Sequence, residues 1–394
     1  MTYTKFCQTP RGLRPVITFV GCCNSGKSSL INAITKQKVS IVSEVSGTTT
    51  DAVMKAFELV PFGPVILYDT AGLDDTSPLG EKRIKATMKI LEKSNLVVLV
   101  CAEKGVSQTD KDAITFLQQK KKNFIVVFNK NDSLNFSQKD ILFCEKNNIP
   151  FIKLSAKQDV SSLYQFLGDY IKPEPSNLFE TYLNKEDIVV LVAPIDESAP
   201  KGRLILPQVQ AIREILDAHA TAFIAQPSEL KNLLKCLNKK PRLIVSDSQA
   251  LKQVAQSVSD IPLTTFSVLM ASLKGDLTVF NKGVEQLDKL QDGDKVLICE
   301  SCSHKICSDD IAQVKLPKAI LKYTNRKIVF EYTHGSDFPD NPAKYKLLIH
   351  CGACMFNREE MMSRIQKCLK ANVPITNFGL VISKLNHIHL TDIR

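Results

Sequence analysis

The chain has 394 residues, of which 44% are hydrophobic and 23% are charged. This length exceeds what one hydrophobic core can organise, and the composition is that of a soluble globular protein. The net charge of +10 is mild for the length, and no apolar run approaches the ~20 residues of a membrane helix, which excludes a membrane protein.

The N-terminal sequence MTYTKFCQTPRGLRP lacks the apolar segment of a signal peptide, so we expect a cytoplasmic protein. In that compartment the 12 cysteines are expected to be thiols or metal ligands rather than disulfides. Lysine clusters at residues 120–122 and 239–240 have no interleaved aromatic residues. They are therefore interpreted as solvated helix ends, and a nucleic-acid partner is not expected.

Between residues 15 and 170, short β-rich runs alternate with amphipathic helical segments. The runs are VITFV, GPVILYD, NLVVLV, NFIVVFN and IPFIKLS. This alternation predicts βαβ units around a mainly parallel sheet, that is, an α/β domain at residues 1–172. The proline-containing segment IKPEPSNLF that follows is predicted to be a linker.

Two further α/β sections follow the linker. DIVVLVAPI, TAFIA, PRLIVS and PLTTF predict four strands separated by helical segments, which define a second domain at residues 173–267. It carries no visible chemistry, so packing or self-association is its expected role. A third domain at residues 268–394 contains the strand-like runs KVLIC and YKLLI and the helical segment NREEMMSRIQKCLKAN.

Residues 21–28 read GCCNSGKS, a complete GxxxxGKS match between a predicted strand and a predicted helix. The loop glycines let backbone N–H groups surround phosphate oxygens, and the following helix N-terminus adds partial positive charge. Lys27 is predicted to reach the β- and γ-phosphates, and the Ser28 hydroxyl to bind Mg²⁺. Cys22 and Cys23 occupy variable positions and are interpreted as neutral, compact residues.

Three later motifs, each at a strand end, support the nucleotide site, and one of them selects guanine. In DTAG, Asp69 would hold Mg²⁺ through water, and the Gly72 N–H would contact the γ-phosphate. In NKND, the Asp132 carboxylate can accept two hydrogen bonds from guanine, a donor pair that adenine lacks. SAK, at residues 155–157, would close over the base.

These motifs resemble the translation-factor-class GTPases, and more narrowly the group that contains the tRNA-modifying GTPase. The resemblance implies that Thr49, or else Thr48, in the GTTTD segment binds Mg²⁺ in the GTP state. It implies that Asn24 helps bind K⁺, and Leu73 replaces the usual water-orienting Gln. The nucleotide-binding residues are then Gly21, Asn24, Ser25, Gly26, Lys27, Ser28, Ser29, Asn129, Lys130, Asp132, Ser155, Ala156 and Lys157.

Near the C-terminus, cysteine and histidine occur at close spacing in two clusters, CxH and HCxxC. Their members are Cys302, His304, His350, Cys351 and Cys354. Both clusters follow predicted strands, so parallel neighbouring strands would bring them together. From spacing alone, a structural zinc and a 4Fe–4S cluster held by three cysteines remain open, and buried thiols are less favoured.

A guanine-specific domain, an α/β unit and a terminal CxH…HCxxC pattern together resemble the FeFe-hydrogenase maturation GTPase, the HydF family, over essentially the whole chain. The resemblance implies GTPase, dimerisation and cluster-binding domains. It also implies a scaffold, a homodimer or larger, that receives a di-iron precursor from two radical-SAM maturases and delivers it to apo FeFe-hydrogenase. The cluster cysteines are then Cys302, Cys351 and Cys354.

On the same resemblance, His304 and His350 are a labile fourth ligand or donors near the bound precursor. Cys307 lies beyond the motif; it could be an alternative ligand and is more simply a core thiol. His334 is a possible extra ligand. The expected catalysis is slow GTP hydrolysis assisted by Mg²⁺ and K⁺. The alternative hypothesis is an RNA- or ribosome-associated GTPase whose third domain is a zinc module.

Overall fold

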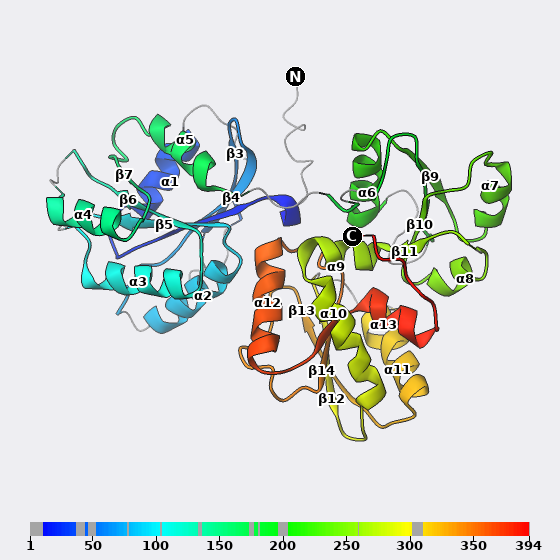
Figure 1. Ribbon diagram of the computed structural model, residues 1–394. Helices are drawn as coiled ribbons and strands as arrows, with labels where there is room; N and C mark the ends of the chain where they lie inside the picture. Colours follow the sequence, from blue (N-terminus) through cyan, green and yellow to red (C-terminus); the bar gives the residue numbers. More distant parts are fainter. Residues whose placement is uncertain are drawn as a thin grey trace. The chain divides into compact units, whose positions relative to one another are not determined.

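The computed structural model describes residues 11–36, 44–45, 53–76, 79–102, 105–132, 136–172, 177–179, 182–195, 204–258, 260–301 and 310–393. The chain divides into two compact units, Met1–Glu174 and Pro175–Arg394. The described strands form one seven-stranded sheet in the first unit and two four-stranded sheets in the second (Figure 1). The predicted α/β class with mainly parallel strands is confirmed.

The sheet of the first unit has the order β2-β3-β4-β1-β5-β6-β7. Its strands are β1 (Val16–Val20), β2 (Glu44–Val45), β3 (Val53–Leu59), β4 (Gly63–Asp69), β5 (Leu96–Cys101), β6 (Phe124–Phe128) and β7 (Phe151–Lys153). Only the pairs β2–β3 and β3–β4 are antiparallel among these strands. Five strands match the predicted runs, whereas β2 and β3 were not predicted.

Helices cover both faces of this sheet (Figure 1). They are α1 (Lys27–Lys36), α2 (Gly80–Glu92), α3 (Gln108–Gln119), α4 (Gln138–Lys146) and α5 (Ser161–Tyr170), preceded by the 3-10 turn η2 (Arg11–Leu13). Side chains of α1 and α5 share one apolar core with the sheet, and side chains of α2, α3 and α4 share the other. Fully buried apolar strands such as β5 fit a sheet covered on both sides.

The second unit begins with a parallel sheet of order β11-β10-β8-β9. Its strands are β8 (Ile188–Val192), β9 (Thr221–Ala225), β10 (Leu243–Ser246) and β11 (Leu263–Thr265), and its helices are α6 (Leu206–Asp217), α7 (Leu230–Cys236) and α8 (Leu251–Ala255). All of these elements lie within predicted segments. Strand β9 is at an edge of this sheet.

The last sheet is also parallel and has the order β13-β12-β14-β15. Its strands are β12 (Lys295–Glu300), β13 (Val329–His334), β14 (Leu347–His350) and β15 (Ile375–Asn377). Its helices are α10 (Leu277–Val284), η3 (Glu285–Lys289), η4 (Ile311–Lys315), α11 (Leu316–Thr324), α12 (Arg358–Lys370) and α13 (Phe378–Leu385). The runs that precede the two Cys/His clusters are thus parallel neighbours, β12 and β14, as predicted.

Helix α9 (Phe266–Lys274) connects the two sheets of the second unit. Phe266 and Leu269 pack in the core of the first sheet, whereas Ala271 packs in a core of the second. The domain boundary expected between residues 267 and 268 falls inside α9. Both sheets pack against this helix and belong to one compact unit.

Candidate functional site

The first candidate site is the phosphate-binding loop between β1 and α1. Positive φ angles at Gly21 (146°), Asn24 (60°) and Gly26 (92°) give the loop the alternating backbone geometry of an anion-binding nest. A Cβ on Gly21 would lie 2.3 Å from the Val100 carbonyl oxygen, and one on Gly26 would lie 2.2 Å from Asn129 Nδ2. Both positions therefore require glycine, as the motif predicts.

Lys27 lies buried at the start of α1. Its Nζ donates to the carbonyl oxygens of Gly21 at 3.0 Å and Cys22 at 2.8 Å, which holds the ammonium against the loop. Burial lowers the pKa of Lys27, and the nearby Asp69 carboxylate opposes that shift. The ammonium group therefore lies against the loop that is predicted to bind phosphate.

Asp69, the last residue of β4, lies next to Ser28. Burial raises the pKa of Asp69, and a hydrogen bond with Ser28 opposes the shift. Among the residues that the structure describes, none forms a hydrogen bond with Asp69 Oδ1, although this oxygen is buried. A carboxylate oxygen without a protein donor, next to a hydroxyl, fits a hydrated Mg²⁺ ion. Thr48 and Thr49 lie outside the described residues.

The segment after β4 folds onto the phosphate loop. Leu73 N donates to the Gly21 carbonyl oxygen at 3.1 Å, and Cys23 N donates to Asp74 Oδ1 at 2.6 Å. A Cβ on Gly72 would lie 2.2 Å from Cys23 Sγ, so only glycine permits this approach. Burial raises the pKa of the Cys22 and Cys23 thiols.

Asn129, the residue after β6, connects the segment predicted to bind guanine with the phosphate loop. Asn129 Nδ2 donates to the Ser25 carbonyl oxygen at 2.9 Å, and its Oδ1 accepts from Ala156 N at 3.1 Å. Lys130 has a φ of 63°. Asp132 is exposed, and a hydrogen bond with Ser155 lowers the pKa of its carboxyl.

Two of the three predicted cluster cysteines lie just after β14. Cys351 and Cys354 are both partly exposed, and Ala353 between them has a φ of 56° that turns the chain. Cys351 Sγ accepts hydrogen bonds from Ser301 N at 3.1 Å and Ala353 N at 3.5 Å. Burial raises the pKa of the Cys351 thiol, and these backbone donors oppose that shift by favouring the thiolate form that binds metal. Ser301, which contacts the Cys351 sulfur, is the residue directly before Cys302 in the sequence.

The other predicted members of the clusters, Cys302 and His304, lie outside the described residues, as does Cys307. Within the described part of the chain, no group of three or more His, Cys, Asp or Glu side chains is placed to hold a metal ion.

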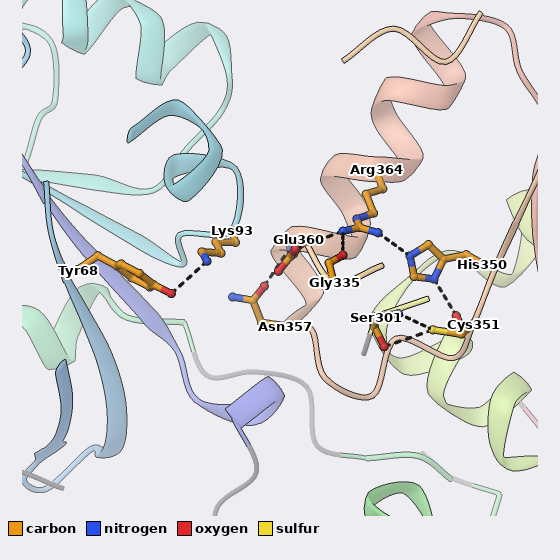
Figure 2. Close-up of polar contacts among 9 residues, drawn as sticks. All are labelled: Tyr68, Lys93, Ser301, Gly335, His350, Cys351, Asn357, Glu360 and Arg364. Atoms are coloured by element: carbon orange, nitrogen blue, oxygen red, sulfur yellow. Dashed lines mark hydrogen bonds and ion pairs between the residues drawn. The ribbon is translucent and has the colours of Figure 1, made fainter. Parts of the chain in front are cut away.

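His350, the last residue of β14, is completely buried. Its Nδ1 is 2.9 Å from the Cys351 carbonyl oxygen and its Nε2 is 3.1 Å from Arg364 Nη1 (Figure 2). Burial lowers the pKa of His350 to about 3, with a further contribution from the Arg364 charge. The imidazole is therefore neutral, and both ring nitrogens are engaged.

Two further groups lie near the cysteines. The sequence offered His334 as a possible extra ligand, and it gave no indication of Arg364. His334 is the last residue of β13. Its Nδ1 lies 3.3 Å from Glu300 Oε2, and its Nε2 lies 3.1 Å from Gln313 Nε2. Arg364 of α12 is buried against His350. The four-residue spacing of Glu360 and Arg364 was visible in the sequence, but it indicates only a helix-surface pair.

Different family models match the two units of the chain. Residues 16–130 match the family model of the 50S ribosome-binding GTPase. Residues 178–275 match the hydrogen maturase F dimerization domain, and residues 278–391 match its tetramerization domain. The chain belongs to the hydrogen maturase F family. The resemblance stated from the sequence is thus confirmed, and the matches favour it over the RNA-associated alternative.

Membership of the hydrogen maturase F family gives the first unit a GTPase domain, and its dimerization and tetramerization domains support a homo-oligomer. No helix in the described ranges is both long and apolar enough to cross a membrane.

Curated relatives match part of this chain. The tRNA modification GTPase MnmE of Caldicellulosiruptor saccharolyticus is 33% identical over 141 residues, 35% of this chain and 30% of the relative. GTPase Der of Leptospira borgpetersenii is 36% identical over 160 residues, 36% of this chain and 32% of the relative. The chain therefore spans about a third of the length of the curated relatives it matches.

Solved structures also match this chain with partial coverage. The G domain of the FeoB iron transporter from T. maritima has a TM-score of 0.32 and 22% identity, and covers 40% of this chain and 98% of its own. Era from Aquifex aeolicus, bound to GDP and AlF4⁻, has a TM-score of 0.33 and 18% identity, with coverage of 61% and 97%.

Proposed function

We propose that this hydrogen maturase F protein is a GTP-hydrolysing scaffold that carries an iron–sulfur cluster. It would hold a di-iron precursor supplied by two radical-SAM maturases and deliver it to apo FeFe-hydrogenase. The observation that carries this proposal is the Cys351 sulfur, which accepts two backbone N–H groups where β12 and β14 end side by side.

The nucleotide part of the proposal assigns a role to each residue of the GTPase site. Lys27 would neutralise the β- and γ-phosphates, while Ser28 and Asp69 would hold Mg²⁺, which supplies charge stabilisation at the γ-phosphate. The Gly72 N–H would contact the γ-phosphate, and Asp132 would accept from guanine. Thr49 is the proposed further Mg²⁺ ligand.

Asn24 is the proposed K⁺ ligand in the phosphate loop. Its φ of 60° places it at a turn of the nest, and its side chain is exposed there. Potassium at this position would supply the positive charge that an arginine provides in other GTPases. Asn24→Ala should therefore abolish any excess of the hydrolysis rate in KCl over NaCl, and an unchanged ratio would exclude this ligand.

Cys302, Cys351 and Cys354 are the proposed ligands of a 4Fe–4S cluster, whose fourth iron would remain open to the precursor. Both ring nitrogens of His350 already have partners, so a role as ligand would require one of those hydrogen bonds to break. We therefore assign the labile-ligand role to His304 and a supporting role to His350.

A maturation assay with the full-length chain tests the function. The chain is co-expressed with both radical-SAM maturases, purified without oxygen and mixed with apo FeFe-hydrogenase, and hydrogen evolution is measured. The wild-type chain should activate the hydrogenase, whereas Cys351→Ser and Cys354→Ser should not. Full activation by both variants would reject the carrier function.

Lys27→Ala is the matched control for independence of the two sites. It should abolish nucleotide binding and leave the iron content unchanged, because the substituted side chain lies in the other compact unit. Loss of iron on this substitution would contradict the separate assignment of the sites.

A further inference from the structure

Arg364 is a buried cation on the helix that follows the CxxC segment. Its side chain is 4% exposed, and its guanidinium lies 4.3 Å from the ring centre of Phe356 and 4.9 Å from that of Phe338. The nearest acidic oxygen in its ion pair, Glu360 Oε1, is 3.5 Å away, a long separation for such a pair. Burying a charge with one long ion pair is costly for folding, so this arginine depends on its other polar contacts.

Besides the contact with Glu360, two shorter hydrogen bonds orient the guanidinium. Arg364 Nη2 donates to the Gly335 carbonyl oxygen at 2.7 Å, and Nη1 faces His350 Nε2 at 3.1 Å. Arginine has only donors, so His350 Nε2 must be the acceptor. The proton of the neutral ring is then on Nδ1, which donates to the Cys351 carbonyl oxygen at 2.9 Å. Figure 2 shows this chain of contacts from α12 to the cysteine loop.

The same peptide segment carries the sulfur of the proposed cluster site. Cys351 Sγ is fixed on its other side by Ser301 N at 3.1 Å, and Ser301 Oγ is 3.2 Å from it. His350 therefore holds the backbone carbonyl of Cys351, and Ser301 holds its sulfur. Hydrogen bonds around a ligand set its orientation and the electronic properties of the metal centre.

We propose that Arg364 is a positioning residue of the cluster site, which acts through His350 on the loop that carries Cys351 and Cys354. The proposal rests on the proposed function, since it requires those cysteines to bind the cluster. In this proposal His350 connects α12 with the cysteine loop, because it contacts both Arg364 and the Cys351 carbonyl oxygen. Arg364 itself need not touch the cluster.

The test uses the full-length chain reconstituted anaerobically with ferrous iron and sulfide. Arg364→Gln removes the guanidinium group and its charge, whereas Arg364→Lys keeps a positive charge. His350→Gln removes the imidazole that connects Arg364 with the cysteine loop. Lys367→Gln is the matched control, because Lys367 lies one turn further along α12 and contacts Asp340 at 3.5 Å. The readouts are the rate of iron loss to a chelator, the electron paramagnetic resonance spectrum after reduction with dithionite, and thermal unfolding.

Arg364→Gln should release iron about tenfold faster or more and change the resonance spectrum, as expected when a residue supporting a ligand is removed. His350→Gln should produce the same change, and the double variant should add nothing to either single variant, because both act in one chain of contacts. Arg364→Lys should be intermediate, and Lys367→Gln should behave as the wild type.

Additive effects in the double variant, or a wild-type spectrum and iron-release rate in folded Arg364→Gln, would overturn the proposal. If Arg364→Gln fails to fold, the spectrum of His350→Gln decides alone, and a wild-type spectrum there also overturns it. Cys351→Ser separates this inference from the proposed function. Iron retained by Cys351→Ser rejects the cluster assignment, whereas iron lost there with unchanged Arg364 and His350 variants rejects only the positioning role.

Discussion

The side-chain amide of Asn129 donates a hydrogen bond to the carbonyl oxygen of Ser25 at 2.9 Å. This contact ties the first residue after β6 to the phosphate loop, while the amide oxygen of Asn129 accepts from Ala156 N at 3.1 Å. One buried side chain thus joins the predicted phosphate-binding segment to the predicted base-binding segment.

Asn129→Ala should weaken GDP binding by about 30-fold, because two hydrogen bonds of ~1 kcal/mol each are lost from the frame of the site. Titration with a fluorescent GDP analogue measures the effect. Asn131→Ala is the control, since Asn131 occupies the variable position of the same motif and is exposed. Equal affinities of the Asn129 variant and the wild type would contradict this role.

Asp132→Asn should lower GTP affinity by at least ~10²-fold, because two hydrogen bonds to a charged acceptor are lost. The same variant should gain affinity for xanthosine triphosphate, whose base has an oxygen where guanine has its amino group and can accept from the Asn amide. Competition between the two nucleotides measures the change. Unaltered preference for GTP would show that Asp132 does not contact the base.

Glu214 of α6 predicts a pH dependence of stability. Burial raises its pKa from 4.5 to about 7, although Leu178 N and Gln210 Nε2 donate to its carboxyl group. The folded state therefore binds the proton more tightly than the unfolded state, and stability decreases as pH rises from about 4.5 to about 7.

Glu214→Gln should remove this part of the decrease, which is on the order of 1–2 kcal/mol after screening by solvent. Urea unfolding of wild type and variant at pH 5 and pH 8 measures it. Glu229→Gln, at an exposed glutamate, should leave the pH dependence as in the wild type. An identical pH dependence of the Glu214 variant and the wild type would contradict the assignment.

The apolar face of α6 and β9 is the predicted contact with a second copy of the chain. Val209 is 49% exposed, Leu216 is 55% exposed and Ile224, on edge strand β9, is 49% exposed. Val209 and Leu216 are seven residues apart and so share one helix face. All three lie within the hydrogen maturase F dimerization domain.

The double substitution Val209→Glu and Leu216→Glu should shift the chain to a smaller species in light scattering after size exclusion, because charge at an apolar interface opposes association. Leu142→Glu in α4, which replaces an equally exposed leucine of the first unit, should not. An unchanged mass of the double variant would place the interface elsewhere.

The sequence predicted the fold well where the hydrophobic pattern was strong. β1, β4 and β9 begin and end where their apolar runs do, and the parallel pair β12 and β14 follows from two such runs. β3 and β13 were missed, because their burial is partial and their residues give no continuous apolar run. Such strands owe their pairing to neighbours far along the chain.

The nucleotide site was more predictable from sequence than the cysteine site. Phosphate loops depend on local backbone geometry, which glycine spacing determines, as at Gly21 and Gly26. The surroundings of His350 depend instead on Arg364 from α12, and tertiary packing of this kind has no local sequence pattern. From the sequence, His350 was expected to be a labile ligand or a donor near the precursor. Its contacts with an arginine and a carbonyl oxygen could not be predicted in that way.

Iron and sulfide analysis, with electron paramagnetic resonance, of the anaerobically reconstituted full-length chain is the most direct test of the central claim. We predict about four iron and four sulfide per chain, with the spectrum of a reduced 4Fe–4S cluster that disappears in Cys351→Ser. A colourless protein that holds one zinc ion per chain and has no such spectrum would contradict the account.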